Sequence, residues 1–161
     1  LPFERTDSSV ISSNKNFAIY DGPEWTIALI ASRLHWVWAN TVCSKLKNDF
    51  QYSNTQGWNT FPVPKLSEDQ FEALNASARK ILKCRYSHYP ATIAQLYDPD
   101  KMPDDLRAVH REKDELLETM YIGRPFRNDT ERLEHLFKLY AAKIKQIKKQ
   151  AAKSKSGQRS K

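Results

Sequence analysis

The residues best suited to chemistry lie in one stretch, residues 43–64, which interleaves cations, one carboxylate, amides and aromatic rings. Lys47 and Asp49 are two positions apart, so in an extended backbone their side chains point to the same side. Lysine only donates hydrogen bonds and ionised aspartate only accepts them. A G·C pair offers acceptors on guanine and a donor on cytosine in the major groove. The two residues therefore suit the reading of one base pair, and the plain alternative is a surface ion pair of little energetic value.

Further polar side chains near this pair are candidates for contacts to phosphate or for support of the base-reading residues. They are Arg33, Lys45, Gln51, Tyr52, Asn54 and Asn59. His35 has two interpretations, as a histidine satisfied in or beside the core or as a contact to the DNA backbone. Trp36 and Trp38 are expected in the core rather than as stacking platforms.

Several short motifs of this region occur in the same order in a known family. Ser32-Arg33-Leu34-His35-Trp36-Val37-Trp38 is followed by residues 45–53 and then by Asn59-Thr60-Phe61-Pro62-Val63-Pro64. This order resembles the end of the target-recognition domain in MmeI-like enzymes, which join an adenine DNA methyltransferase, often with an endonuclease, to one recognition domain. Further on, His88-Tyr89-Pro90, Leu96-Tyr97-Asp98-Pro99, residues 102–107 and His110 resemble the C-terminal helical segment of that family.

The resemblance extends over about residues 8–142 and implies roles for individual positions. In this family the positions that match Lys47 and Asp49 are variable and read a base pair, and the alternative there is an acid followed by arginine. The order lysine then aspartate implies a guanine on the strand that faces Lys47. Conservative departures from the commoner arginine, serine, tyrosine and tyrosine of the family are found at Lys45, Asn48, Phe50 and Trp58.

The resemblance also implies partners and a cofactor. Double-stranded DNA is the expected ligand, and an upstream methyltransferase domain of the same polypeptide is the expected neighbour. That domain would bind S-adenosylmethionine, and magnesium would be needed only where a nuclease is present. No cofactor and no metal are expected in this chain. Because its first residues are neither an initiator methionine nor a signal peptide, the chain is interpreted as part of a longer cytoplasmic protein.

No catalytic centre is expected within the chain. A methyltransferase needs an Asn/Asp-Pro-Pro-Tyr type loop and a glycine-rich turn, but the sequence has no Pro-Pro and its 4 glycines are isolated. A nuclease motif of the Asp/Glu-x-Lys type is also missing. The only cysteines, Cys43 and Cys84, are too few for a disulfide framework and lack zinc-finger spacing, so both are expected to be structural thiols.

The sequence predicts a mainly α fold, a small α-helical bundle preceded by a partial α/β target-recognition segment with short strands. The expected domains are residues 1–62, the C-terminal part of the recognition domain, and residues 63–150, the helical bundle. A basic, disordered tail is expected at 151–161. Two short strands are predicted at 9–11 and 17–20, followed by one largely buried helix over about 23–43.

Capping signals mark the helices of the second half. Ser67 with Gln70, and Asn128 with Glu131, form capping-box patterns that predict helix starts. A short helical turn is predicted at 92–97, and a helix at 103–121 that begins at a proline and ends before Gly123. The three longer helices are expected to form one bundle.

The charge of the chain is distributed unevenly. The total is +7, but residues 138–161 contain nine cations and no acid, which leaves −2 for the rest. The basic character therefore belongs to the C-terminal end and does not by itself mark the whole fold as a DNA-binding surface.

Three functions remain open from the sequence. The first is a DNA-recognition module that is not itself catalytic. The second is a helical interaction module that docks on the methyltransferase domain or on a partner subunit. The third is a nonspecific nucleic-acid binder that acts through the basic tail, with a merely solubilising tail as the plain alternative.

Overall fold

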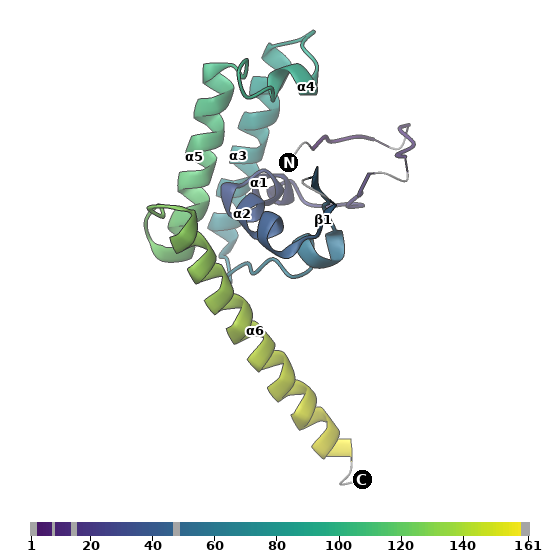
Figure 1. Ribbon diagram of the computed structural model, residues 1–161, viewed down its shortest axis with the longest axis vertical. Coiled ribbons are helices and arrows are strands. Elements are labelled where there is room, and N and C mark those ends of the chain that lie inside the picture. The colour runs from purple at the N-terminus through teal and green to yellow at the C-terminus, as the bar shows by residue number, and fades with distance from the viewer. Residues whose placement is uncertain (1–2, 8, 14–15, 47–48, 159–161) are drawn as a thin grey trace. The chain divides into compact units, whose positions relative to one another are not determined.

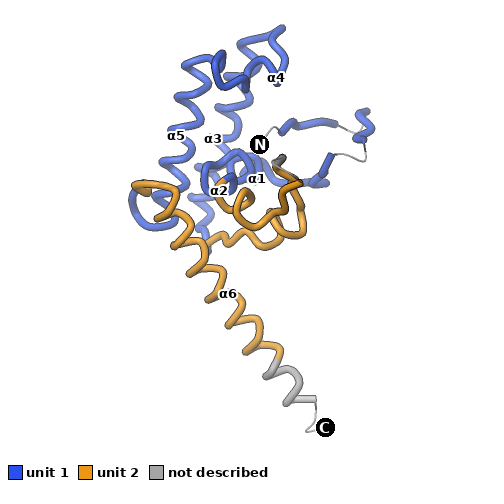
Figure 2. The backbone as a smooth tube through the Cα atoms, in the orientation of Figure 1, with its two compact units in different colours: residues 1–36, 65–125 blue, residues 37–64, 126–161 orange. Residues whose placement is uncertain are grey.

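The computed structural model describes residues 3–7, 9–13, 16–46 and 49–158, which are arranged in two compact units (Figures 1 and 2). Unit 1 contains residues 1–36 and 65–125, and unit 2 contains residues 37–64 and 126–161. Regular structure in the described residues is almost wholly helical, which confirms the mainly α fold class. Each unit combines an earlier with a later segment of the chain, and the domain boundaries given above stay a prediction.

Unit 1 is built around α3 (Glu68–Ser87), which packs against α1 (Trp25–Ile30) and α5 (Asp104–Ile122) (Figure 1). The short α4 (Ile93–Leu96) connects the far ends of α3 and α5. Apolar side chains at helical spacing supply the core between them. Its buried members at the α4 end are Ile81, Leu96, Leu106 and Val109.

Local capping explains where these helices begin and end. Oγ of Ser67 accepts from the backbone N–H of Gln70, and the Gln70 side chain accepts from the Ser67 N–H, as predicted. Thr92 and Gln95 form the same reciprocal pair at α4. Gly123 ends α5 with a φ of 77°, a left-handed conformation that glycine adopts without steric cost.

The single helix predicted over 23–43 is wrong, because the chain forms α1 and α2 (Arg33–Val42) with a break at residues 31–32. Ser32 Oγ donates to the Leu29 carbonyl and accepts from the His35 backbone N–H, so it serves both helix ends. Nδ1 of His35 lies 3.2 Å from the Ile30 carbonyl oxygen. Nζ of Lys113 donates to the Ala31 carbonyl oxygen at 2.7 Å. Side chains therefore replace the intrahelical partners that the break removes.

The two strands predicted near the N-terminus are also wrong. The described residues in 9–13 and 16–20 form no strand, and Ile11 and Tyr20 are 96% and 88% exposed. A two-stranded hairpin needs a packed face for stability, and these side chains have none here. The pattern of residue types was compatible with strands, but the burial that stabilises them is missing.

Unit 2 contains the second half of α2, the strands β1 (Lys45–Leu46) and β2 (Asp49–Phe50), the π-helix η1 (Asn54–Trp58) and α6 (Asp129–Gln158). Its core is aromatic: the ring of Trp38 lies 5.0 Å from that of Phe137 and 5.5 Å from that of Tyr140, measured between centroids. Two residues of the apolar stripe of α6, Phe137 and Tyr140, thus pack on Trp38 within unit 2, and the bundle of three long helices stays a prediction.

The start of α6 agrees with the prediction. Oδ1 of Asn128 accepts from the Glu131 N–H at 2.9 Å, and the Glu131 carboxylate accepts from the Arg127 N–H at 2.7 Å. Helix α6 is described through Gln158, and the separate basic tail expected at 151–161 stays a prediction. In the described parts of the chain, no helix is long and apolar enough to cross a membrane.

Candidate nucleic-acid interface

The predicted base-reading region contains a small antiparallel hairpin. Lys45 pairs with Phe50 and Leu46 with Asp49, and the Gln51 N–H donates to the Ser44 carbonyl at 3.1 Å beyond the strand end. Lys47 lies outside the described residues, and only the backbone of Asp49 is described. Of the predicted partial α/β segment, the described residues thus contain only these two short strands as β structure.

A π-helical turn follows the hairpin. Oγ of Ser53 accepts from the Gln56 N–H at 3.4 Å, and the Asn59 N–H donates to the Asn54 carbonyl at 2.8 Å, five residues back. π-Helical turns are rare and frequently occur at functional sites. The wide turn leaves Asn54, Thr55 and Gln56 exposed at the surface. We call residues 44–60 the hairpin–turn segment.

Close packing under Gly57 holds the turn against the hairpin. A Cβ atom at this buried glycine would lie 2.9 Å from Cε2 of Tyr52 and 3.2 Å from Sγ of Cys43. The Tyr52 ring meets Phe50 edge-on, with the centroids 6.2 Å apart. Cys43 Sγ lies 3.7 Å from the Ser53 carbonyl oxygen. Cys43 and Tyr52 therefore position the segment from beneath.

Tyr52 is half-buried, and this determines its chemistry. Burial, and to a lesser degree the neighbouring Cys43, raises the pKa of the Tyr52 phenol to about 12. The hydroxyl is protonated at neutral pH, as in an ordinary tyrosine, and is able to donate a hydrogen bond. Of the predicted contact residues in unit 2, Tyr52 is the one with a clear supporting role.

The other predicted residues fall into two groups. Lys45 in β1, Gln51 after β2, Asn54 in η1 and Asn59 after it are all exposed on the hairpin–turn segment. Arg33 is different, because it belongs to unit 1, where it begins α2 and its backbone N–H donates to Oδ1 of Asp114 at 2.8 Å. The structure thus places four of the side chains on one exposed segment of unit 2 and leaves Arg33 outside it.

His35 and Trp38 are buried in the core, in agreement with the core interpretation of both residues. His35 is 0% exposed, Trp38 is 1% exposed and Trp36 is half-buried. Burial lowers the pKa of His35 to about 4, against the opposing effect of its hydrogen bond to Ile30. A neutral, enclosed imidazole is not placed to contact a DNA backbone.

Sequence reasoning missed two exposed side chains, Thr55 and Gln56, and the residues that position them, Ser53 and Gly57. A signal existed, because Ser53-x-x-Gln56 has the serine-to-glutamine spacing of a capping pattern. The wide π-turn itself has no comparable sequence signature. Unit 2 also carries exposed cations along α6, and these are Lys138, Lys143, Lys145, Lys148 and Lys149.

Comparison with known proteins identifies the family from both halves of the sequence. Residues 1–65 match the family described as "MmeI, target recognition domain", and residues 66–148 match "MmeI, C-terminal domain". The chain belongs to the MmeI family. The family prediction made from the short motifs is thereby confirmed.

The chain is also similar to the DNA methyltransferase A of Bacillus subtilis (strain 168), with 35% identity over 140 residues. The alignment covers 87% of this chain and 16% of that protein. A solved structure of the Type IIL restriction-modification enzyme MmeI in complex with DNA is also similar, with 29% identity and a TM-score of 0.72. It covers 76% of this chain and 16% of the MmeI chain, so the chain spans a small fraction of either relative.

Proposed function

We propose that this chain is the sequence-recognition and C-terminal module of a site-specific adenine DNA methyltransferase of a restriction-modification system, and that it is not itself catalytic. The observation that carries the proposal is the exposed polar hairpin–turn segment, anchored on aromatic side chains within the part that matches the MmeI target recognition domain. Both similar proteins act on or bind DNA according to their names.

The chemistry of the segment fits base and backbone contacts. A two-stranded ribbon is narrow enough to enter the major groove, where asparagine and glutamine pair with adenine and lysine with guanine. We assign Lys47 and Asp49 to one G·C pair, as the family resemblance implies. Lys45 and Arg33 are assigned to phosphate, which positions a protein without specifying sequence. Gln51, Asn54 and Asn59 complete the contacting set.

The remaining partners follow from the length of the relatives. Because the chain spans only 16% of each, we place an S-adenosylmethionine-dependent methyltransferase domain in the same polypeptide and assign the chemistry to it. Magnesium is required only where the same polypeptide also carries a nuclease domain. The cytoplasm, where chromosomal DNA is the substrate, is the proposed location.

Modified-base sequencing tests this function in cells that express the full-length protein. We expect methyladenine in one short asymmetric motif. Lys45→Gln is the matched control, because loss of a phosphate contact should lower methylation at all sites without changing the motif. The proposal fails if a folded, S-adenosylmethionine-binding protein methylates no defined motif.

A second candidate is docking on another protein surface, favoured by the exposed apolar side chains of the N-terminal segment. These side chains are Val10, Ile11, Phe17, Ile19 and Tyr20, exposed by 44% to 96%. Such a surface suits the methyltransferase domain itself or a partner subunit. Duplex binding by the chain, measured at several salt concentrations, separates the candidates: a recognition module loses affinity steeply as salt rises, and a pure docking module does not bind duplex.

A further inference from the structure

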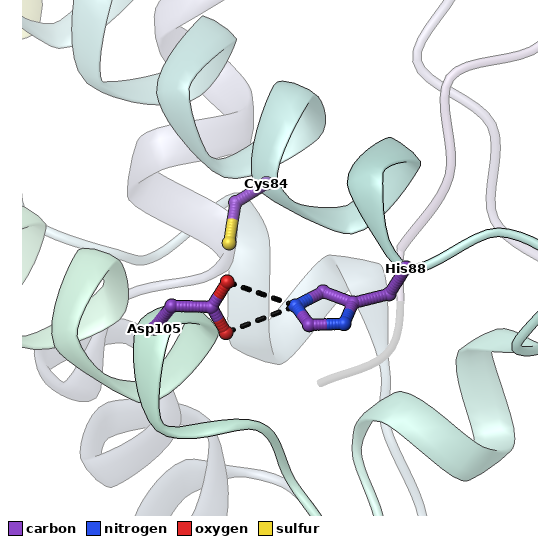
Figure 3. A group of neighbouring side chains, drawn as sticks. All are labelled: Cys84, His88 and Asp105. Carbon is purple, nitrogen blue, oxygen red and sulfur yellow. Dashed lines mark hydrogen bonds and ion pairs between the residues drawn. The ribbon is translucent and has the colours of Figure 1, made fainter.

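One group of three metal-ligating side chains converges in the described residues, away from the hairpin–turn segment. Cys84, His88 and Asp105 each place a ligand atom within 4.8 Å of the others (Figure 3). Nε2 of His88 is 2.9 Å from both carboxylate oxygens of Asp105. Figure 3 shows the Cys84 sulfur directed toward the same carboxylate.

The fold brings these residues together for simple reasons. Cys84 lies in the last turn of α3 and His88, four positions later, is the C-cap residue of that helix, so the two side chains are about one turn apart. Asp105 lies in the first turn of α5, and α5 packs against α3. All three belong to unit 1.

We propose that Cys84, His88 and Asp105 form a binding site for a divalent transition metal, with Zn²⁺ as the best-suited ion. Thiolate, imidazole and carboxylate are the three protein ligands that zinc accepts. In a tetrahedral site such ligand atoms lie about 3.3–3.6 Å apart, a spacing that follows from metal–ligand bonds of about 2.0–2.3 Å. Small rotations of the three side chains therefore close the present arrangement around an ion.

The exposure of two of the ligands suits a metal site with an open position. The His88 side chain is 29% exposed and that of Asp105 is 56% exposed, so an ion reaches them from solvent and water completes the coordination. Burial, and then the charge of Asp105, raise the pKa of the Cys84 thiol. Binding of the ion would form the metal–sulfur bond and release the thiol proton to solvent.

The competing explanation is a plain His88–Asp105 ion pair that joins the two helices. That pair does not involve the Cys84 sulfur, whereas the proposed site uses it as a ligand. An ion bound by all three ligands would link the end of α3 to the start of α5 and stabilise unit 1. This site is independent of the proposed DNA-recognition function.

Titration of the full chain with Co²⁺, after removal of any affinity tag, tests the site. We expect sulfur-to-cobalt charge-transfer absorption and visible bands of tetrahedral cobalt, both abolished by added Zn²⁺. Cys84→Ser should remove the charge-transfer absorption, and Cys43→Ser is the matched control that should retain it. Loss of His88 in His88→Ala should weaken Co²⁺ binding by at least about tenfold, because even losing a group that only orients a ligand costs ~10–100-fold.

Thermal unfolding gives a second, independent readout. Zn²⁺ at micromolar concentration should raise the Tm of the wild-type chain and of Cys43→Ser, and leave that of Asp105→Asn and Cys84→Ser unchanged. Circular dichroism at low temperature establishes that each variant is folded. Cobalt spectra without sulfur absorption in the wild type, or equal Tm shifts in the wild type and Cys84→Ser, would overturn the proposal in favour of the ion pair alone.

Discussion

The indole N–H of Trp38 donates to Oγ1 of Thr60 at 3.0 Å, and that hydroxyl donates in turn to the Gln56 carbonyl. Trp38 is 1% exposed and lies in the aromatic core of unit 2, while Gln56 belongs to the π-helix. One buried side chain thus fixes the exposed turn to the core through a single hydroxyl. The position of the proposed contact residues depends on this link.

Breaking the link should destabilise unit 2. Thr60→Val leaves the buried indole N–H without an acceptor, which should lower the free energy of unfolding by about 1–3 kcal/mol. Trp38→Phe removes the donor of the same hydrogen bond. The double variant Trp38→Phe/Thr60→Val should therefore lose less free energy of unfolding than the sum of the two single variants. Thr55→Val is the control, an exposed position expected within about 0.5 kcal/mol of wild type. Denaturant unfolding measures all four, and strict additivity would contradict the link.

Gly57→Ala should disturb the packing under the turn. The new methyl group would lie 2.9 Å from the Tyr52 ring and 3.2 Å from the Cys43 sulfur, so we expect a loss of about 1–3 kcal/mol in stability and weaker duplex binding. Gly22→Ala is the matched comparison. Its methyl group would approach Ile19 Cγ2 at 2.7 Å, but that side chain is 44% exposed and free to move away. An equal effect of both substitutions would argue against a packed turn.

Stability should fall with acid because of two buried histidines of unit 1. Burial lowers the pKa of His35, and also that of His110, to about 4, whereas an unfolded histidine titrates near 6.5. The unfolded state therefore binds more protons between these pH values, and the free energy of unfolding decreases as pH falls from about 6.5 toward 4. For His35 alone the loss amounts to ~3 kcal/mol.

Urea unfolding between pH 4 and 7 measures this dependence. His35→Gln removes the titrating ring, and its side-chain amide retains a donor for the Ile30 carbonyl. The variant should show a shallower decline in stability than the wild type over the same pH range. An unchanged slope would mean that the pKa of His35 is the same in the folded as in the unfolded protein.

The capping residues show which parts of the fold are predictable from sequence. Ser67 and Gln70 are three positions apart and satisfy each other's backbone groups, so the signal and its structural effect are local. The same holds for the left-handed residue Gly123 that ends α5. These helix boundaries were therefore predicted within a few residues.

The features that the sequence did not predict depend on contacts between residues that are distant in the chain. The break after α1 is accommodated by Lys113, which is 82 positions from the Ala31 carbonyl that it caps. No window of sequence contains both groups. In the same way, the spacing of Cys84 and His88 was visible, but the approach of Asp105 depends on how α3 and α5 pack.

Lys113 and Asp114 should differ sharply in their response to substitution. Lys113 is 0% exposed, and its Nζ donates to the Ala31 carbonyl and to Oδ1 of Asp114, both at 2.7 Å. Asp114→Ala would leave the ammonium group buried with one partner fewer, at an expected cost of about 3–5 kcal/mol. Lys113→Met removes the charge itself and should cost less. Thermal unfolding at neutral pH compares the two variants, and a larger loss for Lys113→Met would contradict this account.

Exchange of the charge order at positions 47 and 49 tests the base-reading assignment. Lys47→Glu with Asp49→Arg presents an acceptor where a donor stood, so guanine should no longer be preferred on the strand facing position 47. One good contact of this kind is worth ~1–3 kcal/mol of discrimination, enough to change the methylated motif at one position while binding persists. Modified-base sequencing with the full-length protein gives the readout, and Lys45→Glu is a matched charge reversal that should lower methylation without altering the motif. An unchanged motif in the double variant would refute the assignment and move the search for base-reading groups to Gln51, Asn54 and Gln56.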